Sequence, residues 1–401
     1  MNKVYLCDFV RTPIGRYGGA LATVRADDLA ALPIREMARR HKGLNGSLDE
    51  VYLGCANQAG EDNRNVARMA LLLAGLPETV PGITVNRLCA SGLDAVVAAA
   101  RAIGTGEIDV AIAGGAESMT RAPFVMAKPG KAFDRAVETY DTTLGWRFVN
   151  ERLHERYGTD SMPETGENVA EVFGIPREAQ DAFALRSQKR VEAARKDGWW
   201  CRQIMPVTLH LPKAKTVVVD RDEYPRPGST LETLAALRPV VRPGGTVTAG
   251  NASGINDGAA ALLLASQAGV EKLGLKPFAR VVGAAASGVA PRVMGMGPVS
   301  AIEKLLFRLN WTPGEVDVIE LNEAFASQAI ACLRQLGIAE EADHVNPFGG
   351  AIALGHPLGM SGARIAGNAA LALAHFGARR ALASMCVGVG QGVAVAFEAV
   401  D

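Results

Sequence analysis

Residues 83–113, ITVNRLCASGLDAVVAAARAIGTGEIDVAIA, contain the pattern that indicates the fold class. A short β-branched run, Ile83–Val85, is followed by an Ala-rich helical run, Ser91–Ile103, and then by a second apolar run, Val110–Ala113. Alternation of this kind is typical of βαβ units, in which helices cover a buried sheet. We therefore predict an α/β fold with a buried, mostly parallel sheet.

The same order of elements returns near the end of the chain. A strand-like piece begins at Val345, a helical pattern covers Gly362–His375, and Ala381–Met385 again resembles a strand. At a constant offset of 270 residues, Ser91-Gly92 falls on Ser361-Gly362. We interpret the two regions as duplicated α/β halves, although matches this short also arise by chance in an Ala/Gly-rich chain.

The composition changes between these two halves. Residues 122–246 are charged, and they contain three tryptophans and the Pro-rich stretch Tyr224–Gly228, which are poor material for a core sheet. Long insertions in compact domains are often lids or binding loops. We predict an inserted loop domain at residues 122–246, an N-terminal core at residues 1–121 with 247–271, and a C-terminal core at residues 272–401.

The bulk properties exclude several classes of protein. The 401 residues are 48% hydrophobic and 21% charged, which is typical of a folded globular chain, and Lys+Arg equals Asp+Glu at 42 each. With no net charge, the protein has no overall positive electrostatic field that would attract nucleic acid or an anionic membrane. Asp8 and Arg11 interrupt the first apolar stretch, and no segment approaches the ~18 uncharged apolar residues of a membrane span. Six scattered cysteines without a CxxC pair indicate free thiols, so we expect a cytoplasmic protein.

Cys89 is the first candidate for chemistry. It follows the run Ile83–Val85 and precedes the helix that opens at Ser91. The unpaired N–H groups at a helix N-terminus favour a thiolate, so we expect a lowered pKa and a nucleophile here. The alternative is a buried core cysteine, which is the commonest fate of this residue type.

Three further polar residues stand at strand ends or among glycines. Cys386 ends the run Ala381–Met385, and chemistry in α/β sheets gathers at such carboxyl ends. His356 lies in a glycine-rich segment beside Pro357, and an imidazole is what a cysteine nucleophile needs as a base. Asn322 follows the run Val316–Leu321, with a helix N-cap as its alternative role. No HExxH, CxxC or acidic cluster indicates a metal, and no GxGxxG follows a strand, so neither a metal nor NAD is expected.

Five motifs, taken together, give the chain a family resemblance. In chain order they are Asn86–Gly92 (NRLCASG), Gly250–Gly254 (GNASG), Asn322–Phe325 (NEAF), Gly355–Gly362 (GHPLGMSG) and Cys386–Gly390 (CVGVG). In order and spacing this set resembles the thiolases, and the resemblance runs over essentially the whole chain. It implies two similar α/β cores plus a loop domain, and carbon–carbon bond chemistry on a 3-oxoacyl-coenzyme A.

The resemblance also implies a role for each site residue. Cys89 would be the acylated nucleophile, and His356 would accept its proton and help to hold the thioester oxygen. Cys386 would move the proton at the α-carbon. Asn322 would fix a water beside His356 in one oxyanion hole, and the N–H groups of Cys89 and Gly388 would form the other.

For coenzyme A, the positions that match the family are Arg226, Thr233, Ser253 and, near the pantetheine, Met162. CoA thioesters would be substrates, with no permanently bound cofactor. Members that resemble this chain are usually dimers of dimers, so the resemblance also implies a homo-oligomer, specifically a homotetramer.

Substrate choice depends on one departure from the family pattern. Many acetyl-specific thiolases carry a His where this chain has Ser161. The segments around Ser161 and Trp146-Arg147 resemble 3-oxoadipyl-CoA thiolases of bacterial aromatic degradation, and Arg147 is a candidate to meet the terminal carboxylate. The alternatives are an acetoacetyl-CoA thiolase, a broad 3-ketoacyl-CoA thiolase, a ketoacyl synthase and a non-catalytic acyl-CoA-binding protein.

Overall fold

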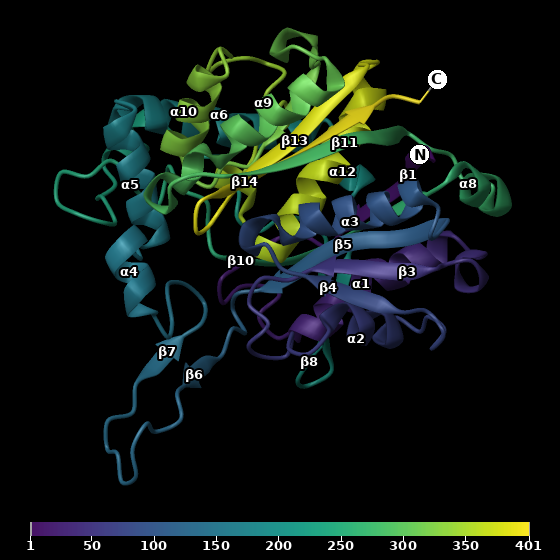
Figure 1. The fold of residues 1–401 in the computed structure, drawn as a ribbon, viewed down its shortest axis with the longest axis horizontal. Helices are drawn as coiled ribbons and strands as arrows, with labels where there is room; N and C mark the ends of the chain where they lie inside the picture. The colour runs from purple at the N-terminus through teal and green to yellow at the C-terminus, as the bar shows by residue number, and fades with distance from the viewer. Residues whose placement is uncertain (1, 401) are drawn as a thin grey trace.

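The main sheet has ten strands and runs through the whole protein (Figure 1). The computed structural model describes residues 2–400. The strand order is β12-β13-β14-β11-β1-β10-β5-β3-β4, with β2 paired to β10. The strands are β1 (Val4–Arg11), β2 (Gly15–Arg16), β3 (Glu50–Gly54), β4 (Gly82–Val85), β5 (Val110–Ser118), β10 (Asn256–Ala265), β11 (Ala279–Gly288), β12 (Val318–Leu321), β13 (Arg380–Val387) and β14 (Gln391–Glu398).

The prediction of a mostly parallel sheet is wrong. Only β3–β4, β3–β5 and β12–β13 pair in parallel, whereas the other six pairings of this sheet are antiparallel. Strand–helix alternation reveals the parallel βαβ part of each half, but β14 returns through a tight turn after β13, and β10 arrives from beyond the insertion. No helix lies between β13 and β14, and the helices between β5 and β10 belong to the insertion, so the alternation could not show the direction of either returning strand.

The two halves of the sheet repeat one pairing pattern. In the N-terminal half, β3 pairs in parallel with β5, β5 is antiparallel to β10, and β10 is antiparallel to β1. In the C-terminal half, β12, β13, β14 and β11 pair in the same sequence of directions. The predicted α/β fold with duplicated halves is therefore confirmed. Val345 forms only an isolated bridge to Ile319 at the position that β4 takes in the other half.

Helices cover both faces of the two half-sheets and also lie between them (Figure 1). Helices α1 (Ala26–Arg40) and α2 (Val66–Leu73) pack on the outer face of the N-terminal half. Helices α9 (Gly297–Leu309) and α10 (Ala326–Gln335) pack on the outer face of the C-terminal half. Helices α3 (Ser91–Thr105) and α12 (Leu358–Phe376) fill the space between the halves.

Glycines allow α3 and α12 to touch backbone to backbone. A Cβ atom on Gly92 would lie 2.4 Å from the carbonyl oxygen of Gly359, and one on Gly362 would lie 2.3 Å from the amide nitrogen of Leu93. Real side chains do not tolerate such distances, so these positions require glycine. The N-terminal ends of the two central helices are thereby held together.

One helical stretch among residues 2–400, Leu88–Thr105, is long and apolar enough to span a membrane by length and composition alone. It consists of α3 and the turn before it, and more than half of it is buried inside the protein. The apolar surface of this stretch therefore packs inside the protein, where α3 contacts α12.

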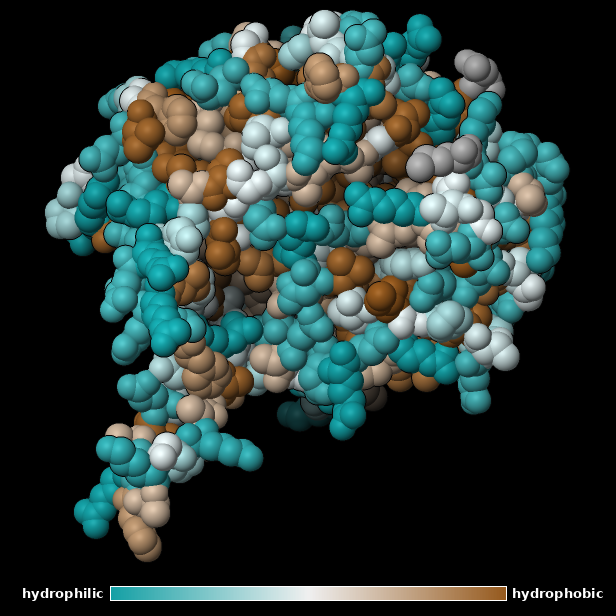
Figure 2. Space-filling model, in the orientation of Figure 1, coloured by the Kyte–Doolittle hydropathy of each residue, from teal (hydrophilic) through white to brown (hydrophobic). Residues whose placement is uncertain are grey.

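The insertion after β5 holds most of the remaining elements. Its two-stranded arm, β6 (Phe124–Met126) with β7 (Thr139–Asp141), projects away from the body of the protein (Figures 1 and 2). The other elements of this region are α4 (Glu151–Tyr157), α5 (Met162–Val172), α6 (Arg177–Lys196), β8 (Val207–Leu211), β9 (Lys215–Val219) and α7 (Leu231–Ala235). Two further helices lie outside the insertion, α8 (Gln267–Leu273) and α11 (Ala351–Leu354). The described residues also form five short 3-10 helices: η1 (Leu44–Gly46), η2 (Leu88–Ala90), η3 (Trp200–Arg202), η4 (Pro291–Met296) and η5 (Pro313–Glu315). The domain boundaries given above stay a prediction.

Candidate active site

Cys89 lies in the η2 turn that leads into α3. The preceding residue, Leu88, has a left-handed backbone with φ of 47°, so the chain turns sharply immediately before the thiol. The backbone N–H groups of Gly388 and of Cys89 itself face the sulfur and lower its pKa, but burial of the sulfur outweighs them and raises the pKa to about 11. The expectation of a lowered pKa is therefore wrong. Cys89 is a neutral thiol near neutral pH, because desolvation is larger than the helix-end effect.

Cys386 lies close to Cys89. It is buried within β13, and the tight turn that follows carries Gly388 toward the Cys89 sulfur. Burial raises the pKa of the Cys386 thiol well above its usual range, and the neighbouring Cys89 raises it further. The structure thus brings together both predicted thiols and the predicted N–H group of Gly388.

His356 is held by one hydrogen bond at its backbone and one at its ring. Its backbone N–H donates to Oδ1 of Asn256 at 2.9 Å, and its Nδ1 lies 2.7 Å from Oγ of Ser361. The Ser361 hydroxyl also lies 2.9 Å from the carbonyl oxygen of Pro357, and when its proton is donated there, Nδ1 is the donor in the contact with Ser361. The opposite nitrogen, Nε2, is then a bare acceptor.

The electrostatics of His356 agree with a neutral base. Burial, together with the nearby Arg364, lowers the pKa of the imidazole to about 3. The Nε2 atom is buried and has no protein partner among residues 2–400. Helix α12, which begins two residues after His356, packs against the η2 turn that carries Cys89.

Asn322 follows β12 directly and is fully buried. Its Oδ1 and Nδ2 atoms find no protein partner in the described part of the chain. Helix α10 begins only at Ala326, with Phe325 at its N-cap, so the alternative role of Asn322 as a helix cap is wrong. Ala324 and Phe325 pack against Cys386, which places the segment beside the second thiol. A buried amide without partners calls for a water or a ligand.

A cavity of about 300 Å³ opens over Cys89, and we call it the Cys89 cavity. Gly388 and Met162 line it together with three residues of the predicted acyl-recognition segments, Trp146, Arg147 and Ser161. His356, Asn322 and Cys386 are not among its lining residues.

Arg147 carries a charge that no carboxylate of residues 2–400 neutralises. Its one hydrogen bond, from Nη2 to the carbonyl of Asn57, is long at 3.4 Å. The two acids of the Cys89 cavity are already engaged, since Asp160 pairs with Arg292 at 2.9 Å and Glu117 accepts backbone N–H groups. Within residues 2–400, Arg147 therefore makes no structural salt bridge.

A second cavity, of about 280 Å³, contains Arg226 and Thr233, and we call it the Arg226 cavity. The Arg226 guanidinium lies over the ring of Tyr224 at 5.5 Å. The Thr233 hydroxyl accepts the N–H of Thr230, the N-cap residue of α7, at 2.9 Å. Met162 lines the Cys89 cavity instead. Ser253 lines neither cavity, and its N–H donates to the carbonyl of Ala324 in the Asn322 segment at 2.9 Å.

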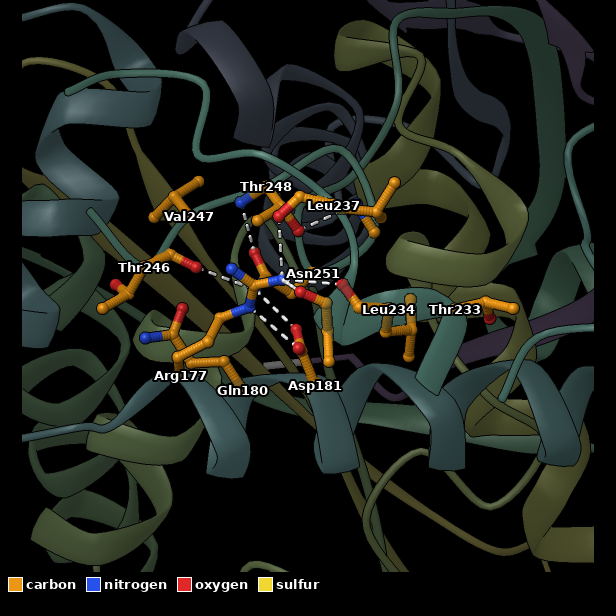
Figure 3. A network of polar contacts seen from close by, with 12 residues as sticks. Arg177, Gln180, Asp181, Thr233, Leu234, Leu237, Thr246, Val247, Thr248 and Asn251 are labelled. Carbon is orange, nitrogen blue, oxygen red and sulfur yellow. Dashed lines mark hydrogen bonds and ion pairs between the residues drawn. The ribbon is translucent and has the colours of Figure 1, made fainter. Parts of the chain in front are cut away.

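A polar network fixes one wall of the Arg226 cavity (Figure 3). The Asn251 amide donates to Asp181 of α6 at 3.0 Å, and its oxygen accepts the N–H of Thr248 at 2.8 Å. Arg177 pairs with Asp181 at 2.8 Å and donates to the carbonyl of Leu234 at 2.6 Å. Helix α6 thereby holds both α7 and the GNASG segment in place.

Comparison with protein families matches nearly the entire chain. Residues 4–268 match the model of the thiolase N-terminal domain, and residues 275–399 match that of the thiolase C-terminal domain. The chain belongs to the thiolase family. The family resemblance in the sequence is thereby confirmed.

Three relatives within the thiolase family show how far the likeness extends. The chain is 62% identical over 400 residues to a beta-ketoadipyl-CoA thiolase of Pseudomonas aeruginosa, with 100% of both chains covered. It is 57% identical over 401 residues to a 3-oxoadipyl-CoA/3-oxo-5,6-dehydrosuberyl-CoA thiolase of Escherichia coli K12, again with 100% of both covered. A solved structure, the Bacillus anthracis acetyl-CoA acetyltransferase, matches with a TM-score of 0.93 at 40% identity, covering 100% of this chain and 99% of that one.

Sequence reasoning missed one cluster beside the site of this thiolase-family member. Cys55, Asp62 and Glu117 bring their ligand-type atoms within 4.8 Å of one another. Their polar atoms are engaged in hydrogen bonds, since Cys55 donates to Asp62 at 3.5 Å and Glu117 accepts from Ala56 and Asn57. Burial raises the pKa of Glu117 to about 7. Cys55 and Asp62 are seven residues apart, but Glu117 is 62 residues from Cys55, so no single local motif contains all three.

Proposed function

We propose that this chain catalyses the thiolytic cleavage of 3-oxoadipyl-CoA by coenzyme A. The observation that carries the proposal is the grouping around the η2 turn: the Cys89 thiol faced by two backbone N–H groups, a second thiol beside it, and His356 just before helix α12, which packs against this turn. The Nε2 atom of His356 is buried and has no protein partner among residues 2–400. A hydrolase needs one nucleophile and water, whereas reversible Claisen chemistry needs a nucleophile and a separate base at carbon. The full-length likeness to two thiolases named for this substrate supports the choice of acyl chain.

The proposed first step is the cleavage of the bond between C2 and C3 of the substrate. The Cys89 sulfur attacks the C3 carbonyl while its proton passes to Nε2 of His356. The C2–C3 bond then breaks, its electron pair forms the enolate of acetyl-CoA, and Cys386 donates a proton to C2. Carbons C3 to C6 remain on Cys89 as a succinyl thioester.

In the second step coenzyme A takes over the succinyl group. The Cys386 thiolate removes the proton of the coenzyme A thiol, whose sulfur attacks the thioester carbonyl. Cys89 leaves and takes back the proton from His356, and succinyl-CoA forms. Every group then has its starting protonation state.

The pKa values of both partners suit this route. A pKa of about 11 for Cys89 and of about 3 for His356 keep the resting pair neutral, so the proton moves only as the C–S bond forms. The N–H groups of Cys89 and Gly388, which face the Cys89 sulfur, would hold one tetrahedral oxygen, and each such donor is typically worth ~3 kcal/mol. Asn322, whose amide lacks a protein partner, would hold a water for the other oxygen.

Coenzyme A would enter as a substrate through the Arg226 cavity. Arg226 has no carboxylate partner among the ion pairs of residues 2–400, and it suits an anionic phosphate. Arg147, equally without a carboxylate partner, would meet the terminal carboxylate of the acyl chain in the Cys89 cavity. An acetoacetyl chain ends in a methyl group and would leave this cation without a partner, which favours the dicarboxylic substrate over the shorter one.

The test compares turnover of 3-oxoadipyl-CoA and acetoacetyl-CoA with free coenzyme A, with products identified by mass spectrometry. We expect acetyl-CoA and succinyl-CoA in equal amounts, a higher kcat/KM for 3-oxoadipyl-CoA, and a succinyl group on Cys89 in quenched samples. Faster turnover of acetoacetyl-CoA would contradict the substrate but leave a thiolase. Absence of any acyl group on Cys89 would contradict the mechanism itself.

We also propose a cytoplasmic homo-oligomer, a dimer of dimers. The β6–β7 arm, which projects from the body of the protein (Figure 2), supports the assembly. Four of its apolar side chains are each at least 57% exposed, namely Phe124, Met126, Phe133 and Val137. Exposed apolar side chains on an arm are suited to a partner subunit. Shortening the arm to a Gly-Ser turn should lower the mass measured by sedimentation, and an unchanged mass would contradict its role.

A further inference from the structure

Glu117 is a buried carboxylate that joins the two halves of the protein. It lies near the end of β5 and is only 2% exposed. Its Oε2 accepts the N–H of Ala56 at 3.0 Å and that of Gly359 at 2.8 Å, and its Oε1 accepts the N–H of Asn57 at 3.1 Å. Ala56 and Asn57 follow β3 in the N-terminal half, whereas Gly359 lies in the first turn of α12.

The duplicated pattern shows what this contact corresponds to. The offset of 270 residues that superposes Ser91 on Ser361 also places Cys89 on Gly359, and Glu117 on Val387, the residue before Gly388. At one of the two equivalent places, Gly388, which directly follows β13, directs its N–H group to the Cys89 thiol at the start of α3. At the other, the end of β5 presents a carboxylate to the start of α12. The start of α3 therefore carries the nucleophile Cys89, whereas the equivalent start of α12 is hydrogen-bonded to the side chain of Glu117.

The position of Gly359 also determines that of His356. A Cβ atom on Gly359 would lie 2.5 Å from the carbonyl oxygen of Ala116 and 2.7 Å from that of Gly54, so α12 begins tightly against the ends of β5 and β3. Only two residues separate His356 from Gly359, Leu358 and Pro357, and the ring of Pro357 restricts the backbone. The segment is therefore fixed at His356 by Asn256 and at Gly359 by Glu117.

We propose that Glu117 is a positioning residue that fixes the His356 imidazole relative to the Cys89 thiol by holding the first turn of α12 from the opposite half. The inference rests on the proposed function, because its consequence is the rate at which Cys89 becomes acylated. Glu117→Gln keeps the shape of the side chain. Because both oxygens of Glu117 accept backbone N–H groups, the NH₂ group of the glutamine must face at least one donor and cannot accept its hydrogen bond. Glu167→Gln is the matched control, since Glu167 is also 2% exposed and accepts the N–H groups of Thr246 and Val247 in another loop.

The experiment is a double-mutant cycle with His356→Ala. Acylation of Cys89 by acetyl-CoA is followed by rapid quenching and intact-protein mass spectrometry, with thermal melting to verify folding. Glu117→Gln should slow acylation by about 10- to 100-fold when His356 is present, the scale expected for a misplaced catalytic group. When His356 is absent, the same change should cost less than about threefold, because the group it positions is gone. Glu167→Gln should give equal factors in both backgrounds.

Equal factors for Glu117→Gln in both backgrounds would overturn the proposal and leave the proposed function intact. A wild-type chain that is never acylated at Cys89 would instead overturn the proposed function and this inference with it. Glu117→Asp, which keeps the charge but shortens the reach, replaces Glu117→Gln if the latter does not fold. It should show a smaller loss with the same dependence on His356, and a loss independent of His356 would again refute the role.

Discussion

Replacing Arg147 with alanine should abolish most of the preference for 3-oxoadipyl-CoA over acetoacetyl-CoA. The guanidinium makes one long hydrogen bond, at 3.4 Å to Asn57, and no ion pair within residues 2–400, so no protein carboxylate competes for it. A hydrogen bond between charged groups contributes ~1.5–3 kcal/mol. At ~1.4 kcal/mol for each factor of ten, the ratio of the two kcat/KM values should fall by about 10- to 150-fold.

The assay measures initial rates of cleavage on both substrates at saturating coenzyme A. Arg226→Ala is the matched control, because it removes an arginine from the cavity proposed for the shared part of both substrates. It should lower kcat/KM on both substrates by one common factor. Arg147→Lys should retain part of the preference, since it keeps the charge but loses the two-pronged geometry. If Arg147→Ala lowers both activities equally, or neither, the carboxylate of the substrate is held elsewhere.

Three further outcomes are expected. Cys386→Ser should leave acylation of Cys89 by acetyl-CoA measurable in a rapid-quench assay, while cleavage falls by ~10²–10⁴-fold; equal loss of both would show a shared role. Because burial raises the pKa of Cys89 to about 11, its thiolate fraction and its alkylation by iodoacetamide should rise about tenfold per pH unit from pH 7 to 9, and a plateau there would contradict the shift. Asp222→Asn removes the buried partner of Arg11 and should lower the free energy of unfolding by ~3–5 kcal/mol. Asp343→Asn, at an ion pair whose carboxylate is fully exposed, should change it by less than ~1 kcal/mol, and similar losses in denaturant titrations would refute the distinction.

The sequence predicts best what local pattern controls. The helical run Ser91–Ile103 lies within helix α3, and the runs Ile83–Val85 and Ala381–Met385 lie within strands β4 and β13. The motifs around Cys89 and Cys386 also identify residues that the fold brings together. These successes share one cause, since periodicity and short motifs are properties of consecutive residues.

Long-range properties could not be predicted in the same way. The direction of β14 depends on a tight turn, and that of β10 on where the chain returns after the insertion. The pKa of Cys89 depends on how deeply its sulfur is covered by segments from the entire chain, which outweighs the local helix-end effect. Glu117 carries no motif, and its partners Ala56 and Gly359 are separated from it by 61 and 242 residues.

The place of β10 in the sheet has a consequence for how the protein is made. Strand β10 lies between β1 and β5, yet more than a hundred residues separate it from the end of β5. During synthesis the ribosome must complete the insertion before the N-terminal half obtains its central strand. Until then the apolar edges of β1 and β5 stay unpaired, and such edges promote aggregation. Translation of residues 119–255 is therefore an interval in which a chaperone would be most useful to the nascent chain, and a fragment that stops before Asn256 should not fold.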